Sequence, residues 1–171
     1  MHHLAVSLLL LSAAAHAEEE PQVEIAADGS VVGRILLDAT PAQVSGVIPS
    51  LNDPANSSSV LDVRLVPDGE CTGIFRTTRG LWSPLTMRTR LCPTAKGWRE
   101  YLVESEDYDA YDVEWTVSPA DAGRTEVRMV VRSEVNLAVP SAIVRGKTVV
   151  GVRESFAALV RRLFGAKAEK R

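Results

Sequence analysis

The stretch between residues 58 and 135 constrains the fold of this chain more than any other feature. Apolar and polar residues alternate along it, as in Leu61, Val63 and Leu65 around Asp62 and Arg64, which is typical of strands with one buried face. Short turns rich in Gly, Pro, Ser and Asp separate the runs, so neighbouring strands are expected to pair antiparallel. Together with an earlier run, the pattern predicts seven strands, near residues 30–38, 61–65, 71–79, 84–92, 98–105, 111–118 and 124–135.

Two helices are predicted beside these strands. Residues Thr40–Gln43 form a capping-box pattern with proline at the first helical position, so a short helix follows the first strand. A long amphipathic helix is expected to start at Pro140 and to stop at Gly165. Gly146 and Gly151 lie inside it, and each costs the helix roughly 1 kcal/mol relative to alanine. They either permit close backbone approach, allow a bend, or leave room for a bound molecule.

Cys71 and Cys92 are the two cysteines of the chain. If the strands on either side of the 80–83 loop pair with each other, these residues lie directly opposite across the hairpin. A non-hydrogen-bonded pair of this kind brings the side chains within reach of a disulfide. Export to an oxidising compartment would favour the same bond, and two free buried thiols are the alternative.

The same register sorts the middle hairpin into two faces. One face carries Cys71, Gly73, Thr77, Arg88, Arg90 and Cys92. The other is more apolar and should look inward, as should the apolar sets of two later strands: Thr72, Ile74, Arg76, Leu85, Met87 and Leu91, then Val113, Trp115 and Val117, then Val127, Met129 and Val131. Arg76 is the exception on this face. It is a ligand-orienting charge, a member of a salt bridge inside a cavity, or a side chain exposed by a bulge.

Residues 1–17 have the pattern of a secretory signal peptide. An apolar run leads to a small-x-small cleavage site at Ala15–Ala17, just before three glutamates, so we predict cleavage after Ala17 and a periplasmic or secreted protein. A buried N-terminal helix is the alternative. The domain organisation predicted on this basis is a signal peptide over 1–17, an acidic leader over 18–29, one folded domain over 30–165 and a basic tail over 166–171.

Composition excludes several classes of function. The three histidines stand at positions 2, 3 and 16, so cleavage would leave a domain without histidine-dependent catalysis. Two thiols alone make a poor zinc site, and neither a metal nor a cofactor is predicted. The formal net charge is −3, and no dense basic patch with interleaved aromatic residues is present, so nucleic acid is not an expected partner.

The order of elements resembles the START-like superfamily (SRPBCC), in the bacterial branch of polyketide cyclases and coenzyme Q-binding START proteins. The resemblance covers about residues 30–165 and rests on Ile35–Val44, Ser50–Pro54, Trp82–Pro84 and Val139–Pro140. It implies an α+β helix-grip fold, in which a curved antiparallel sheet wraps the long C-terminal helix and leaves an elongated apolar cavity. Typical guests of this superfamily are lipids, sterols, quinones and polyketides.

This resemblance implies a binding or carrier protein for a lipid or other hydrophobic small molecule. Pockets for such guests are mostly apolar with a few polar groups. The ligand-binding residues predicted here are Arg76, Met87, Trp115, Met129, Val150 and Phe156. Each apolar member of this set could instead simply fill the core.

A cyclase- or hydrolase-type enzyme acting on an apolar substrate is the alternative function. It would use a buried carboxylate or tyrosine as acid or base, with Glu100, Glu104, Tyr101 and Tyr111 as candidates. No paired-carboxylate, Ser-His-Asp or Cys-His arrangement can be assembled, so no residue is assigned as catalytic and an enzyme is the less favoured hypothesis.

The basic tail suggests one further partner. Lys167, Lys170 and Arg171 suit transient contact with an anionic membrane surface. The long helix is expected to pack on its own sheet, so it has no spare apolar face for insertion. Peripheral contact is therefore all that the tail predicts.

Overall fold

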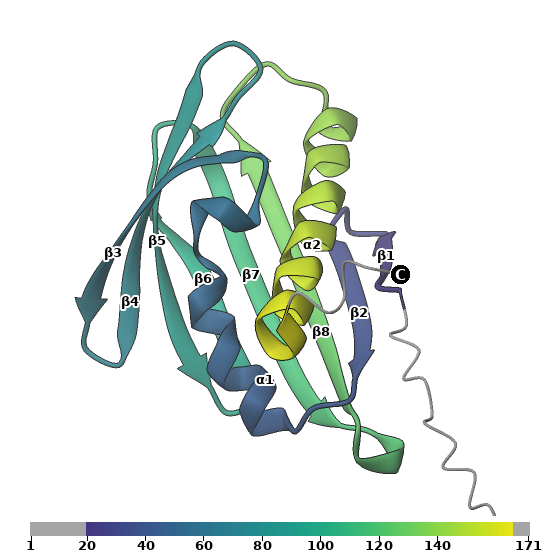
Figure 1. Ribbon diagram of the computed structural model, residues 1–171. Coiled ribbons are helices and arrows are strands. Elements are labelled where there is room, and N and C mark those ends of the chain that lie inside the picture. Colours follow the sequence, from purple (N-terminus) through teal and green to yellow (C-terminus); the bar gives the residue numbers. More distant parts are fainter. Residues whose placement is uncertain (1–19, 166–171) are drawn as a thin grey trace, which may run out of the picture.

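The computed structural model describes residues 20–165, which form one curved antiparallel sheet and a long C-terminal helix (Figure 1). The predicted signal peptide with its cleavage site and the basic tail lie outside the described residues. Within the described part, the sheet has eight strands in the order β1-β2-β8-β7-β6-β5-β4-β3. The expected α+β helix-grip architecture is thereby confirmed.

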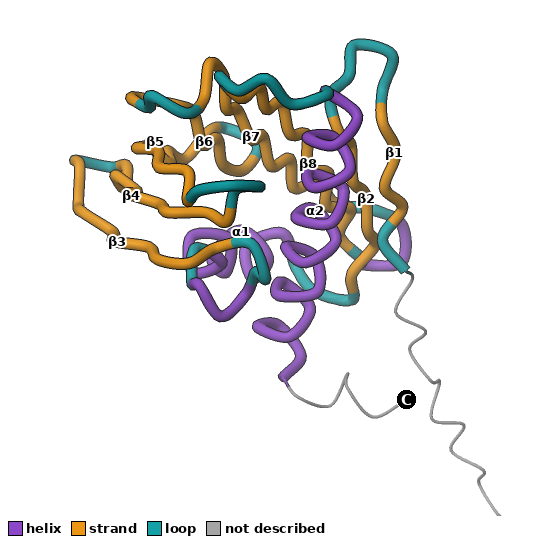
Figure 2. Tube along the Cα trace, turned by 90° about the horizontal axis from the view of Figure 1, so that it is seen from above, coloured by secondary structure: helices purple, strands orange, loops and turns teal. Residues whose placement is uncertain are grey.

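The strands follow the predicted meander closely. Six successive strands from β3 to β8 are joined by short connections. Strand β2, which precedes them in the chain, pairs with the last of them, β8. Their bounds are β1 Gln22–Ile25, β2 Val31–Leu37, β3 Val60–Asp68, β4 Cys71–Arg79, β5 Pro84–Thr94, β6 Gly97–Glu104, β7 Tyr108–Pro119 and β8 Thr125–Val135. Viewed from above, the strands curve so that both helices lie on the concave side (Figure 2).

Strand β1 is the one strand that the sequence pattern did not predict. It lies inside the segment expected to be an acidic leader and pairs antiparallel with β2, where Val23 is opposite Gly33. Val23 packs against the core while Gln22 and Glu24 are exposed. Four residues are too few for a convincing alternation, which is why β1 escapes detection.

Helix α1 (Pro41–Val47) begins with the predicted capping box. The Thr40 hydroxyl accepts a hydrogen bond from the Gln43 backbone N–H at 3.3 Å, and the Gln43 side-chain oxygen accepts one from the Thr40 N–H at 2.9 Å. The helix ends early because Pro49 follows, and two 3₁₀ turns, Ile48–Leu51 and Pro54–Asn56, continue the chain. A third 3₁₀ turn, Asp121–Gly123, joins β7 to β8.

Helix α2 (Ser141–Phe164) packs on β8 and β2 and closes the concave side of the sheet. Phe156 is fully buried, and its ring contacts Trp115 edge-to-face with centroids 5.9 Å apart. The ring lies over Gly33 of β2, where any Cβ atom would overlap it. Glycine at this strand position therefore lets the helix approach the sheet closely. No helix in residues 20–165 has the length and apolar character needed to span a membrane.

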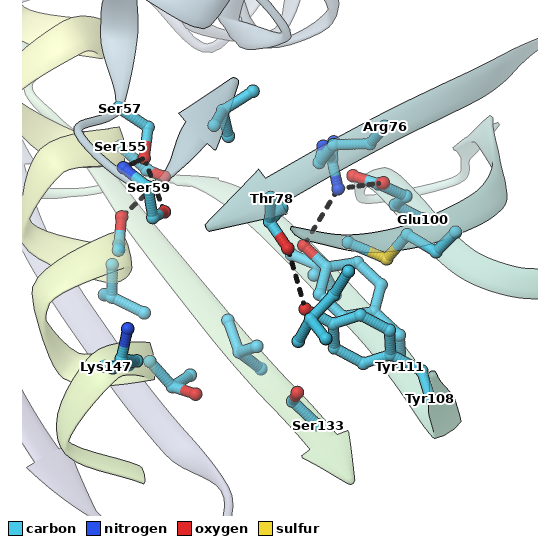
Figure 3. A pocket seen from close by; sticks show the side chains of 18 of the residues that line it. Ser57, Ser59, Arg76, Thr78, Glu100, Tyr108, Tyr111, Ser133, Lys147 and Ser155 are labelled. Carbon is cyan, nitrogen blue, oxygen red and sulfur yellow. Dashed lines mark hydrogen bonds and ion pairs between the residues drawn. The ribbon is translucent and has the colours of Figure 1, made fainter. Parts of the chain in front are cut away.

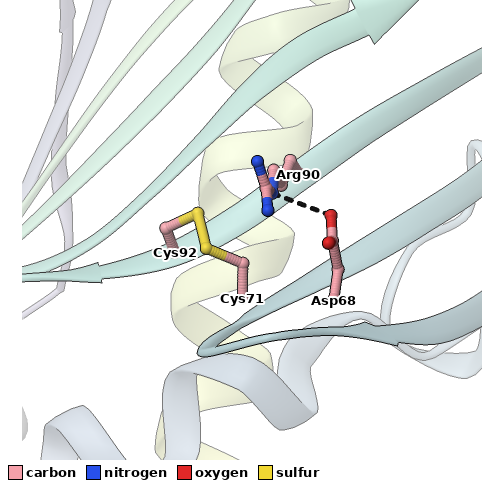
Figure 4. Close-up of a disulfide and its surroundings, with 4 residues drawn as sticks. All are labelled: Asp68, Cys71, Arg90 and Cys92. Atoms are coloured by element: carbon pink, nitrogen blue, oxygen red, sulfur yellow. Dashed lines mark ion pairs between the residues drawn. A yellow bond between two sulfur atoms is a disulfide. The ribbon is translucent and has the colours of Figure 1, made fainter.

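The disulfide predicted from the hairpin register is present. Thr72 pairs with Leu91 and Gly73 with Arg90, which places Cys71 opposite Cys92, and the two Cα atoms are 4.3 Å apart. Figure 4 shows the bond beside the 2.8 Å ion pair between Arg90 and Asp68. These groups lie on the face of the sheet that points away from α2.

The predicted inward face is also confirmed. Ile74, Leu85, Met87 and Leu91 of the hairpin are buried, and so is Arg76, at 8% exposure. Of the residues predicted to face inward on β7 and β8, Val113, Trp115, Val127, Met129 and Val131 are buried, and Val117 is half-buried. Strand alternation therefore gave the correct side for each of these residues.

Candidate functional site

A cavity of about 240 Å³ lies between the concave face of the sheet and α2. Its apolar wall is formed by side chains that sequence alternation places inward on the central strands. They include Met87, Leu91, Val113, Trp115, Met129 and Val131. Apolar residues at its rim are exposed to solvent, namely Leu81 in the β4–β5 hairpin, Leu137 before α2 and Ile143 in its first turn.

A buried ion pair stands on the sheet side of this cavity (Figure 3). Arg76 of β4 contacts Glu100 of β6 at 2.9 Å, and both side chains are less than one-tenth exposed. Arg76 also donates to the side-chain oxygen of Asn52 at 2.6 Å and to the Tyr111 hydroxyl at 3.3 Å. The Thr89 hydroxyl donates to Glu100 at 2.6 Å. Arg76 is thus part of a salt bridge inside the cavity, one of the three interpretations that the sequence left open.

The electrostatics of this cluster fix its protonation. Burial lowers the pKa of Arg76, but the neighbouring Glu100 carboxylate more than offsets this effect, so the pKa of Arg76 lies above its ordinary value. Burial raises the pKa of the Tyr111 phenol, and the charge of Glu100 raises it further against the opposing effect of Arg76. Arg76 therefore keeps its positive charge, and Tyr111 keeps its proton, at any physiological pH.

Other polar groups are spread more thinly around the wall. The hydroxyls of Thr78 and Tyr108 are 3.1 Å apart, and both residues line the cavity. On the helix side, Gly151 lines the cavity, and a Cβ atom built there would meet nothing within 4 Å. Of the three interpretations of this glycine, open space beneath the helix is the one that the geometry supports.

A serine-rich segment closes one side of the cavity against α2. The Glu154 carboxylate accepts hydrogen bonds from the Ser57 hydroxyl at 2.8 Å and from the Ser58 hydroxyl and backbone N–H. Partial burial raises the pKa of Glu154, but these hydrogen bonds outweigh it and hold the pKa below its ordinary value. Nearby, Asp53 pairs with Arg162 at 3.0 Å. The segment that contributes Asn52 to the ion-pair cluster is thus fastened to the helix at two points.

The six predicted ligand residues do not all reach the cavity. Arg76, Met87, Trp115 and Met129 line it. Phe156 does not, because its ring is packed between Gly33 and Trp115 in the core. Val150 is 51% exposed on the outer side of α2 and is also absent from the cavity wall. Helical periodicity gave an apolar stripe on α2 but did not distinguish its core-facing positions from those at its margin.

The alternative acid–base candidates divide in the same way. Glu100 and Tyr111 line the cavity. Glu104 is on the opposite face, 3.9 Å from Arg88, and Tyr101 lies there beside Arg99. Sequence reasoning named Arg76, Glu100 and Tyr111 separately but did not identify them as one cluster, and it missed Asn52. The signal available was that the meander register directs Arg76 and Glu100 to the same face.

Solved structures with the same arrangement come from several bacteria. A START superfamily protein from Mycobacterium smegmatis matches with a TM-score of 0.63 at 14% identity, covering 78% of this chain and 96% of that one. The chain of 171 residues therefore has a START-like fold as well. A STAR-related lipid transfer protein from Xanthomonas axonopodis matches this START-like chain with a TM-score of 0.61 at 16% identity, covering 85% of this chain and 99% of its own.

A third similar structure is an enzyme. The aromatase/cyclase Zhui from a Streptomyces species matches the START-like chain with a TM-score of 0.63 at 15% identity, covering 81% of this chain and 97% of its own. No protein-family model and no curated protein matches the sequence. At identities this low, the structural similarity establishes the START-like fold alone, and the function has to be argued from the site itself. Residues 20–165 hold no group of three or more side chains suited to bind a metal ion.

Proposed function

We propose that this protein is an exported binding or carrier protein for a hydrophobic small molecule or lipid, held between the sheet and α2. The observation that carries the proposal is the cavity itself: a mostly apolar wall with one buried, charge-neutral polar cluster at Arg76 and Glu100. Apolar walls with a few fixed polar groups are typical of small-molecule sites. The similarity to a lipid transfer protein supports the same class of function.

The cavity restricts the kind of guest. Apolar cavities of about 150 Å³ bind molecules of the size of benzene, and most small-molecule pockets measure about 300–1,000 Å³. At about 240 Å³, this cavity suits a compact apolar body, with any longer portion leaving between Leu81 and Ile143 at the rim. Because Glu100 already neutralises Arg76, we expect a neutral hydroxyl or carbonyl group at the cluster rather than a second carboxylate.

Two features support export. The pattern of residues 1–17 is that of a signal peptide, and the disulfide between Cys71 and Cys92 suits an oxidising compartment. We therefore propose a periplasmic or secreted location, with cleavage after Ala17. N-terminal sequencing of the protein recovered from periplasm and medium tests this directly. A chain that keeps Met1 and stays in the cytoplasm would contradict it.

Two glycines of α2 provide a matched test of ligand binding. Gly151→Leu places a side chain in the open space beneath the helix, whereas Gly146→Leu places the same side chain on an exposed part of the same helix. Each change should raise helix stability by roughly 1 kcal/mol, so neither is expected to unfold the protein. We expect Gly151→Leu to abolish uptake of a neutral fluorescent apolar probe and Gly146→Leu to leave it unchanged. Equal binding by both variants would contradict the proposal.

A cyclase- or hydrolase-type enzyme is the second candidate, favoured by the presence of Glu100 and Tyr111 in one cavity. Because its pKa is raised, Tyr111 keeps its O–H, and since Arg76 already donates to its oxygen, that O–H could donate a hydrogen bond to a bound carbonyl group. Incubating the protein with the molecule that it co-purifies with separates the two candidates. A carrier returns the molecule unchanged, whereas an enzyme converts it, and Tyr111→Phe would stop that conversion.

We also propose transient contact of the carrier with anionic membranes during loading, through the basic tail at Lys167, Lys170 and Arg171. The exposed apolar side chains of Leu81 and Trp82 at the hairpin tip would support such contact. Vesicle flotation should then depend on anionic lipid content and fall with added salt. Flotation that is indifferent to both would contradict this contact.

A further inference from the structure

Strand β3 is a free edge of the sheet, and it carries three exposed apolar side chains. It pairs with β4 on one side and stands at the end of the strand order, at the outer left of Figures 1 and 2. Leu61, Leu65 and Val66 are 43%, 48% and 38% exposed. Exposed apolar edges pair readily with another strand.

The backbone of β3 has hydrogen-bonding groups that point away from β4. The 4.3 Å Cα–Cα distance of the disulfide pair marks a non-hydrogen-bonded position between β4 and β5. Counting in twos from Cys71 along β4 brings Phe75 to the β3 side, so its partner Arg64 bonds to β4. The neighbours of Arg64, which are Val63 and Leu65, therefore direct their N–H and C=O groups outward.

The alternation along β4 has an independent check at its end. Arg79 lies an even number of residues from Cys71 and Phe75 along the strand. Its backbone N–H donates to the carbonyl of Ser59 at 2.7 Å. This bond runs toward the β3 side, as the alternation requires.

The sequence of this edge is complementary to itself. The order is Leu61, Asp62, Val63, Arg64, Leu65. In an antiparallel pair with a two-fold axis at Val63, each leucine lies opposite the other leucine of the second copy, and Asp62 lies opposite Arg64 of the second copy. Asp62 has no ion-pair partner among residues 20–165, and its side chain and that of Arg64 are exposed.

We infer that β3 pairs antiparallel with β3 of a second copy of this chain, centred on Val63, to form a two-fold symmetric dimer with one continuous sheet. Val63 exchanges backbone hydrogen bonds with Val63 of the second copy. Two contacts, each between Asp62 of one copy and Arg64 of the other, fix the register. Pro67 has no N–H to offer, and the bulge between Val60 and Asp62 interrupts the ladder, so the pairing is confined to the central residues. An interface of one strand pair is small, and the dimer is correspondingly weak.

Charge exchange tests this register in the disulfide-bonded protein. Sedimentation velocity from roughly 10 µM to 1 mM should show a concentration-dependent dimer. Asp62→Arg places like charges opposite each other twice per dimer and should weaken association about tenfold or more, and Arg64→Asp should do the same. The double variant restores both attractions and should dimerise like the wild type. Asp109→Arg, an equal charge change at an exposed site on β7, is the control.

Three outcomes would overturn the inference. A wild-type monomer at all concentrations would show that Pro67 and the bulge protect a free edge. A dimer that Asp62→Arg leaves unchanged would place the interface elsewhere. Failure of the double variant to recover would refute this register.

Leu65→Lys adds an independent readout, because it should abolish the dimer, whereas Leu81→Lys, at an equally exposed leucine outside β3, should not.

Discussion

Removal of one partner from the ion pair between Arg76 and Glu100 should destabilise the protein strongly. Their charged groups are 2.9 Å apart, and the two side chains are 8% and 7% exposed. Glu100→Leu leaves a buried guanidinium that cannot lose its proton, and such changes cost about 3–5 kcal/mol. For a domain of this size, each kcal/mol corresponds to roughly 2–4 °C, so Tm should fall by about 6–20 °C.

The double variant separates burial of an unpaired charge from loss of packing. Arg76→Met alone should also be destabilising, because Glu100 then keeps a hydrogen bond from Thr89 but no counterion. Arg76→Met combined with Glu100→Leu removes both charges, and replacement of a buried pair by apolar residues is often close to neutral. We therefore expect the double variant to be more stable than the Glu100→Leu variant and to differ from the wild type by about 1–2 kcal/mol.

Urea unfolding followed by tryptophan fluorescence measures these free energies, with the four proteins forming a double-mutant cycle. We expect a coupling energy of about 2 kcal/mol or more between Arg76 and Glu100. Single variants that each cost less than about 1 kcal/mol, with no coupling, would refute the reasoning, because that is the behaviour of an exposed pair screened by water.

Three further changes probe other parts of the structure. Gly33→Ala should cost about 1–3 kcal/mol in thermal unfolding, because the added methyl group overlaps the fully buried Phe156 ring; an unchanged Tm would mean that α2 shifts freely on the sheet. Cys71→Ser opens the link to Cys92 and should cost about 3 kcal/mol in urea unfolding, and no loss would show that the denatured chain gains little freedom. The stability that Glu154 contributes should be present above its unfolded pKa of about 4.3 and lost as pH falls through its lower folded pKa; a Glu154→Gln variant with the same acid dependence would contradict this.

The sheet could be predicted largely from sequence because its information is local. Strand alternation with short turns fixed the meander, and the loop after Arg79 fixed a register that put Cys71 opposite Cys92. The same alternation placed Met87, Trp115 and Met129 on the inner face. In each case a period of two residues and a turn of known length determine the side on which a residue lies.

The polar cluster could not be predicted as a unit because it depends on the curvature of the whole sheet. Arg76 and Glu100 lie on strands separated by β5, and Asn52 follows a 3₁₀ turn whose direction no periodic pattern indicates. The same limit applies to Val150, which shares the apolar character of the α2 stripe and yet lies at its exposed margin. Which part of an amphipathic helix covers a cavity is decided by its rotation on the sheet.

The central claim is that the cavity beneath Gly151 carries an apolar guest. Native mass spectrometry of the protein, expressed with its own residues 1–17 and purified without detergent, tests it most directly. We expect a one-to-one adduct that is extractable with organic solvent, retained by Gly146→Leu and absent from Gly151→Leu. A bare protein mass for the wild type, together with no uptake of any offered lipid, quinone or sterol, would contradict the claim.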